Sequence, residues 1–247
     1  KMAKRKNFSV FGNYLLYISI SIIVIGEIAF AGPVIDAVMV DIPPQIDGIL
    51  DDSCWKKATK VDDFRVLEKE GAPASEKTTA FICYDQKNIY VAFKAFNSNS
   101  TKITAFQEKR GGSLDLDDWV SVSFDTFRPY RGEGYSFKVN PLGTQWEWIP
   151  QGSATNITWR GDWKASADIM KDRWSAEMAI PFGILRYPKN TSSFGIKFSR
   201  YLASKRELSS FVATREPDEN AKWVGLHLPI VGYLPIFLPY VLAGLED

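Results

Sequence analysis

The sequence is poor in the side chains on which metal and thiol enzymes depend. Its 247 residues include one histidine and two cysteines, and none of them stands in a spacing such as CxxC or HExxH. A zinc site takes several such ligands from neighbouring positions. The sequence therefore excludes zinc hydrolases, and an enzyme with a cysteine nucleophile would lack its histidine base.

An excess of charge is also missing. The net charge is +1, from 30 basic and 29 acidic side chains. Without residues 1–31, which carry four basic side chains and one acidic one, it becomes −2. A protein that binds nucleic acid through a broad surface is usually strongly basic, so we expect no nucleic-acid partner.

The start of the chain has the pattern of an export signal. Several basic residues precede an apolar run over residues 14–28, and the small residues Ala29 and Ala31 follow. We expect a signal peptide over residues 1–31, cleaved after Ala31. The alternative is an uncleaved membrane anchor, because the run is nearly long enough to span a bilayer. Both predict an exported protein, located in the periplasm, at the cell surface or in the medium.

Helical periodicity is scarce, whereas alternation of apolar and polar residues dominates from residue 60 onward. The clearest strands are expected within residues 80–96, which form a hairpin, and within 115–127, 135–140, 162–170, 173–181, 192–200 and 209–215. Short helical turns are expected at 51–58, capped by Asp51 or Asp52, and at 181–187. The pattern predicts an all-β protein, a two-sheet antiparallel β-sandwich of the jelly-roll or immunoglobulin-like type, over residues 32–222.

Two further features bear on the domain organisation. Cys54 and Cys83 could form a disulfide in an exported chain, but we favour two small buried side chains, since nothing else in the sequence indicates a disulfide framework. Residues 223–247 are apolar but interrupted by prolines, which makes a straight membrane helix improbable. We expect short strands there, as the start of a domain that this chain lacks.

Four segments together resemble a known family: "PPQIDGILDDSCWKKATKVDDF", "DDWVSVSFDTF", "YSFKVNPLGTQ" and "DRWSAEMAIPFGILRY". They are similar to the family 9 carbohydrate-binding module first described on xylanases. The closest likeness is to the version at the N-terminus of large exported bacterial proteins in which an outer-membrane β-barrel follows. The resemblance covers about residues 40–215. It implies a β-sandwich that binds polysaccharide such as xylan or cellulose, or its reducing ends, without catalysis, in the service of carbohydrate catabolism, and often with bound calcium.

Aromatic residues make up 14% of the chain, with eight tryptophans. A pyranose ring packs its C–H face on a flat aromatic side chain, and planar polar side chains bind its hydroxyls. The predicted carbohydrate-binding residues are Trp146, Trp148, Trp159, Trp163, Arg160, Gln145 and Glu147, with Arg110 as a weaker addition.

The tryptophans differ in what their surroundings predict. Trp159 and Trp163 lie in a polar segment, so we expect them to be exposed. Trp146 and Trp148 share one face of a strand, which could face either water or the core. Trp119 lies on a polar strand face and is a further candidate, whereas Trp55 and Trp174 have the apolar neighbours of core residues.

Acidic residues allow two further hypotheses. Asp115, Asp117, Asp118 and Asp125 could hold calcium, as the resemblance makes plausible, or they could protect the start of a strand from edge pairing. A glycosidase needs two carboxyl groups at a set separation, and Glu147, Asp162 and Glu177 are available, although Glu177 is expected to point outward and form a salt bridge.

Three alternatives to glycan binding therefore stay open. One is a structural domain that docks on or plugs an outer-membrane barrel, the second is a glycoside hydrolase, and the third is a haem-binding sandwich that uses Met170, Met178 or His227. Binding without an obligatory cofactor is the interpretation that we favour.

Overall fold

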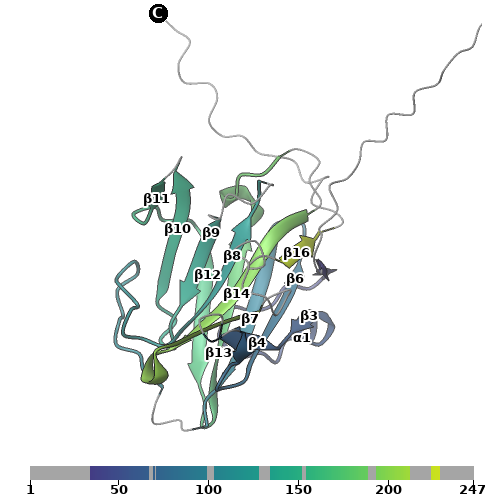
Figure 1. Cartoon of the computed structure of the whole chain (residues 1–247). Coiled ribbons are helices and arrows are strands. Elements are labelled where there is room, and N and C mark those ends of the chain that lie inside the picture. The colour runs from purple at the N-terminus through teal and green to yellow at the C-terminus, as the bar shows by residue number, and fades with distance from the viewer. Residues whose placement is uncertain are drawn as a thin grey trace, which may run out of the picture.

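The alternating strands build two sheets that face each other, as the sequence predicts (Figure 1). The computed structural model describes residues 34–66, 69, 71–98, 103–127, 134–151, 154–188, 193–211 and 224–228. The predicted signal peptide and most of the predicted C-terminal tail lie outside these residues.

The first sheet has ten strands. Its main path runs β11 (Ala154–Asn156), β10 (Gln145–Gln151), β9 (Tyr135–Val139), β8 (Trp119–Asp125), β14 (Ser193–Leu202), β15 (Glu207–Phe211), β4 (Phe64–Val66) and β5 (Ala72–Pro73). Off this path, β16 (Val224–His227) pairs with β14 and with β1 (Val34–Asp36).

The second sheet has six strands. The order is β12 (Lys164–Ile169), β13 (Arg173–Pro181), β7 (Asn88–Phe96), β6 (Thr78–Tyr84) and β2 (Val38–Met39), and β3 (Thr59–Val61) also pairs with β6. The predicted hairpin of residues 80–96 is confirmed as β6 and β7. Helical elements with both ends among the described residues include α1 (Ser53–Lys57) and the 3-10 turns η3 (Phe182–Ile184) and η4 (Ala203–Lys205).

The core lies between the two sheets. Val122, Phe137 and Phe198 come from adjacent strands of the first sheet and are completely buried. Phe198 meets Phe93 of the second sheet edge to face, with 5.9 Å between the ring centroids. Trp174 is also completely buried in this core, as the sequence predicts. Apolar burial of this extent is the main source of the sandwich's stability.

A smaller apolar cluster lies on the outer side of the six-stranded sheet, under α1. Trp55 of α1 is buried there, as predicted, together with Cys54 and Cys83. Both cysteines are free thiols, which agrees with the interpretation as small buried side chains. Asp52 is the N-cap residue of α1, as expected, but its side chain makes no capping bond and instead accepts a hydrogen bond from the Gln45 backbone N–H.

The predicted domain boundary at residue 223 needs correction. Val224–His227 forms β16, which pairs in antiparallel fashion with β14 and in parallel with β1, and Leu226 is buried in the core. These residues therefore belong to the sandwich. Within the described part of the chain, no helix combines the length and the apolar character needed to cross a membrane.

Candidate functional site

The two faces of β10 have opposite environments. In the pairing of β10 with β9, Glu147 stands opposite Phe137, whereas Trp146 stands opposite Lys138 and Trp148 opposite Ser136. Residues directly opposite each other in an antiparallel pair lie on the same side of the sheet. Because Phe137 faces the core, Trp146 and Trp148 lie on the outer face, where both are partly exposed.

The turn before β10 sets this register. Asn140 Oδ1 accepts hydrogen bonds from the backbone N–H groups of Leu142 and Thr144, at 3.1 and 2.8 Å. Gly143 has a φ of +78°, a backbone conformation that favours glycine. The Asn140 amide also donates to Asp117 at 2.8 Å, which ties the turn to the segment before β8. A shift of one residue would move both tryptophans to the core side.

An aromatic row crosses the outer face of four adjacent strands. It consists of Trp146 of β10, Lys138 of β9, Trp119 of β8 and Tyr201 of β14. The Lys138 Nζ lies 4.6 Å from the Trp146 ring centroid and 4.2 Å from that of Trp119. Trp119 stacks on Tyr201, with 5.6 Å between centroids and 21° between planes. Three strand spacings of about 4.8 Å give the row a length of roughly 14 Å.

Serine side chains surround the aromatic row on the same face. Ser123 donates to Ser136 at 3.0 Å, and Ser199 and Ser210 share a hydrogen bond of 2.8 Å. All four are at least 95% buried. These hydroxyls bond to one another and are buried. A ligand on this face would therefore contact mainly the rings of the aromatic row and Lys138.

Lys138 occupies an unusual position for a charged side chain. Burial lowers the pKa of its ammonium group, and the charge of Lys197 lowers it further, whereas Asp115 has the opposite effect. No carboxylate of the described residues forms a salt bridge with Lys138, and none of their polar atoms makes a hydrogen bond with its Nζ. Its close partners there are the two indole rings, through cation–π contacts.

The polar residues of β10 face away from the aromatic row. Glu147 is completely buried, and Arg110 binds its Oε1 at 2.6 Å and the Gly161 carbonyl at 2.6 Å. Gln145 donates to the Trp163 carbonyl at 2.9 Å. The prediction that these three side chains border the tryptophan platform is therefore wrong. They lie on the core side of the sheet and bind neighbouring loops there.

The segment between β11 and β12 also differs from expectation. Trp163 is 3% exposed and packs edge to face on Phe137 at 5.1 Å, so its predicted exposure is wrong. Trp159 is partly buried and contacts Tyr135 and Phe137. Arg160 is exposed, but its guanidinium donates to the carbonyls of residues 157 and 159. This segment covers one side of the core.

The four aspartates proposed for calcium do not form one ligand cluster. Asp117 accepts from the backbone N–H groups of residues 106 and 107, and Asp118 from those of residues 104 and 203. Asp125 is buried at the far end of β8, and Asp115 is exposed. Among the described residues, no group of three or more His, Cys, Asp or Glu side chains could hold a metal ion. The predicted calcium site does not fit this arrangement.

Two of the three carboxylates considered for glycoside hydrolysis, Glu147 and Glu177, are not paired across a cleft. Glu147 and Glu177 are both completely buried, on different sheets. The prediction that Glu177 points outward and forms a salt bridge is wrong. Its carboxylate accepts three hydrogen bonds, from Trp55 Nε1 and from the backbone N–H groups of Asp47 and Gly48. Neither carboxylate is placed to reach a substrate.

The residues considered for haem ligation are engaged elsewhere. Met178 is completely buried in the sandwich core. His227 lies on β16, whereas Met178 lies on β13, and the His227 Nδ1 is 3.0 Å from the Asp36 Oδ1.

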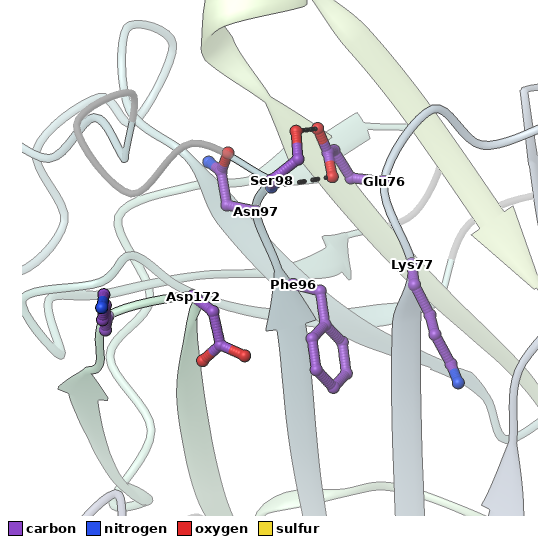
Figure 2. A pocket seen from close by; sticks show the side chains of 7 residues that line it. Glu76, Lys77, Phe96, Asn97, Ser98 and Asp172 are labelled. Atoms are coloured by element: carbon purple, nitrogen blue, oxygen red, sulfur yellow. Dashed lines mark hydrogen bonds between the residues drawn. The ribbon is translucent and has the colours of Figure 1, made fainter.

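A hollow of about 570 Å³ lies where β6 begins and β7 ends (Figure 2). Phe96 and Lys77 line it, with Glu76 and Asp172 at its border. Beneath it, the buried Arg200 donates to the carbonyls of Lys77 and Phe96. Glu76 binds Ser98, and Asp172 pairs with Arg173. The hollow offers a single aromatic ring, so it is less suited to a sugar chain than the aromatic row.

Lys138 and Tyr201 were not among the predicted binding residues. Both stand on the polar faces of their strands. The signal available was the alternation in "YSFKVN", which places Lys138 away from Tyr135 and Phe137. The sequence pattern of a single strand does not show which strands become neighbours, and it therefore could not predict the aromatic row.

Comparisons with known proteins support the fold. No family model matches the sequence, and no curated protein matches it. Among solved structures, a candidate carbohydrate-binding protein from Bacteroides uniformis aligns with a TM-score of 0.61 and 13% identity, covering 80% of this chain and 99% of that one.

Two structures of a family 9 carbohydrate-binding module from Caldicellulosiruptor kristjanssonii also align. The complex with cellotriose has a TM-score of 0.53 at 15% identity and covers 79% of this chain and 92% of that one. The complex with glucose has a TM-score of 0.54 at 16% identity and covers 79% and 95%. The likeness expected from the four sequence segments is thus confirmed at the level of the fold.

Proposed function

We propose that this protein binds a glycan chain, without cleaving it, on the outer face of its ten-stranded sheet. The observation that carries the proposal is the aromatic row, in which Trp146, Trp119 and Tyr201 present partly exposed rings across adjacent strands. Such rings match the C–H faces of successive pyranoses. Because strands hold the rings, the platform is rigid before the sugar arrives, and this lowers the entropic cost of binding.

Two further observations support this function. The chain shares its fold with modules that were solved in complex with cellotriose and glucose. Within the described residues, the buried carboxylates are used for internal hydrogen bonds and leave no acid and base pair beside the rings. The protein therefore acts through affinity, and we expect β-linked polymers such as xylan and cellulose to be retained. Export would place it among such polymers.

The test is retention on insoluble xylan and cellulose, with titration calorimetry on soluble oligosaccharides. We expect the wild type to bind and Trp146→Ala and Trp119→Ala each to lower the affinity roughly tenfold, since each removes one stacking surface. Thermal unfolding should change little, because both side chains are only partly buried. Absence of wild-type binding to xylan, cellulose and a polyuronate alike would refute glycan binding and favour a structural role.

A matched control separates the aromatic row from the hollow of Figure 2. Phe96→Ala removes the ring of that hollow, on the opposite sheet. Unchanged retention in this variant supports the aromatic row as the site. Loss of retention in Phe96→Ala, with normal binding by Trp146→Ala, would assign the sugar to the hollow.

A further inference from the structure

The centre of the aromatic row is occupied by a cation rather than by open space. The Lys138 Nζ lies 4.2 Å from the Trp119 ring and 4.6 Å from the Trp146 ring. A neutral sugar ring and an ammonium group compete for the same electron-rich aromatic faces, because both present partial or full positive charge to them. A platform built only for neutral sugars gains nothing from a lysine at this position.

The ammonium group has donors to spare. A lysine carries three N–H donors, and no acceptor among the described residues takes a hydrogen bond from Lys138. Partial burial between the rings removes much of its water, which strengthens its attraction for an anion. An incoming oxygen that carries negative charge would meet a donor that is already positioned and partly dehydrated.

The neighbouring charges act on Lys138 in opposite directions. Lys197 lies on the same face, since it stands opposite Ser123 in the pairing of β14 with β8. Both its charge and that of Asp115 act on Lys138, but Asp115 forms no salt bridge with it. Asp115 has the larger of the two effects, so the capacity of this face to bind an anion depends on the donors of Lys138 rather than on an excess of positive charge.

We infer that the aromatic row selects an acidic glycan, in which a uronic acid carboxylate binds Lys138 while neighbouring pyranoses pack on the parts of the Trp119, Tyr201 and Trp146 rings that Lys138 leaves uncovered. The inference rests on the proposed glycan binding and names its substrate class. A uronic acid has the same ring shape as a neutral hexose and adds one carboxylate. Lys138 would supply the charge-assisted contact, and the rings would supply the stacking surface.

The experiment compares two polymers that differ in the carboxylate alone: a polyuronate and the same polymer after reduction of its carboxyl groups to alcohols. We expect the wild type to bind the polyuronate about 10-fold to 100-fold more tightly, the range expected for a hydrogen bond between charged groups. The preference should weaken as salt is added, since screening acts on charge pairs near the surface. Lys138→Met should bind both polymers with the affinity that the wild type has for the reduced one. Lys138→Arg should keep the preference for the polyuronate.

Lys94→Met is the matched control. Lys94 also lies over an aromatic ring, 5.5 Å from the Phe81 centroid, but on the outer side of the other sheet. It should leave the preference unchanged. Equal binding of the two polymers by the wild type, or equal loss for both in Lys138→Met, would overturn the acidic specificity and leave neutral glycan binding standing. If the wild type binds none of the four polymers (the polyuronate, its reduced form, xylan and cellulose), both proposals are overturned.

Discussion

The indole N–H of Trp55 donates a 2.6 Å hydrogen bond to Glu177, across 122 positions of the sequence. The other carboxylate oxygen of Glu177 accepts from the backbone of Asp47 and Gly48, at 3.0 and 2.8 Å. These residues belong to the two segments that resemble family 9 modules most specifically, "IDGILDDSCW" and "WSAEMAIP". One buried carboxylate therefore joins the two segments in the fold.

The first prediction concerns this hydrogen bond. Trp55→Phe should lower the free energy of unfolding by about 2 kcal/mol more than Trp174→Phe, because it removes a bond to a buried carboxylate. Trp174 is a suitable control, since it is also buried and its Nε1 has no hydrogen-bond partner among the described residues. Urea unfolding of the two variants measures the difference. Equal losses would mean that the Trp55 bond adds nothing to stability.

The second prediction is a pH dependence. Burial raises the pKa of Glu177 to about 7, against the opposing effect of its three hydrogen bonds. Between the ordinary pKa of a glutamate and 7, the folded state therefore keeps a proton that the unfolded state has lost. The free energy of unfolding should be highest at acidic pH and fall by roughly 3 kcal/mol as pH rises to neutral.

The comparison of wild type with Glu177→Gln isolates this effect from other titrating groups. The glutamine cannot ionise, so the difference between the two proteins should change over the interval from about pH 4.5 to 7 and be constant above it. Urea unfolding at a series of pH values provides the measurement. Parallel stability profiles would show that Glu177 does not titrate in that interval.

Strands were predictable here because each carries a local alternating pattern. Val120, Val122 and Phe124 alternate with polar residues in the sequence, and all three are completely buried. The direction in which Trp146 and Trp148 point was not predictable, because a strand with bulky residues at alternate positions fits either face. The register set by the Asn140 turn decides it.

The site was harder to predict than the fold, since it depends on which strands become neighbours. Trp119 and Tyr201 are 82 positions apart and stack only because β8 and β14 pair. Trp163 was misjudged for a related reason. Its polar neighbours in sequence indicate a surface loop, but the loop folds over Phe137 and buries the indole.

The third prediction concerns Arg110 and Glu147. Arg110→Met should destabilise the protein by about 3 kcal/mol, because it leaves a completely buried carboxylate without its cation. Adding Glu147→Met should restore much of the loss. Lys60→Met is the control for an exposed ion pair, that of Lys60 with Asp62, and should cost less than about 1 kcal/mol. Similar losses in Arg110→Met and Lys60→Met would contradict the burial argument.

The fourth prediction tests whether Trp119 and Tyr201 act as one surface. The two rings are stacked nearly parallel, so removing Tyr201 should let Trp119 leave the orientation in which it meets a sugar. Trp119→Ala and Tyr201→Ala should each weaken glycan binding, and the double variant should lose less than the sum. We expect a coupling free energy of about 0.5 to 1.5 kcal/mol, the range measured for aromatic pairs.

The control for this cycle pairs Tyr201→Ala with Trp148→Ala. Trp148 lies on β10, three strands away from β14, so the two side chains are separated by more than about 10 Å and their effects should add. Calorimetric titration of the same oligosaccharide gives all of the affinities. If Trp119 and Tyr201 prove as additive as this distant pair, each ring binds its own part of the glycan, and the stacking seen between them does not orient Trp119 for the ligand.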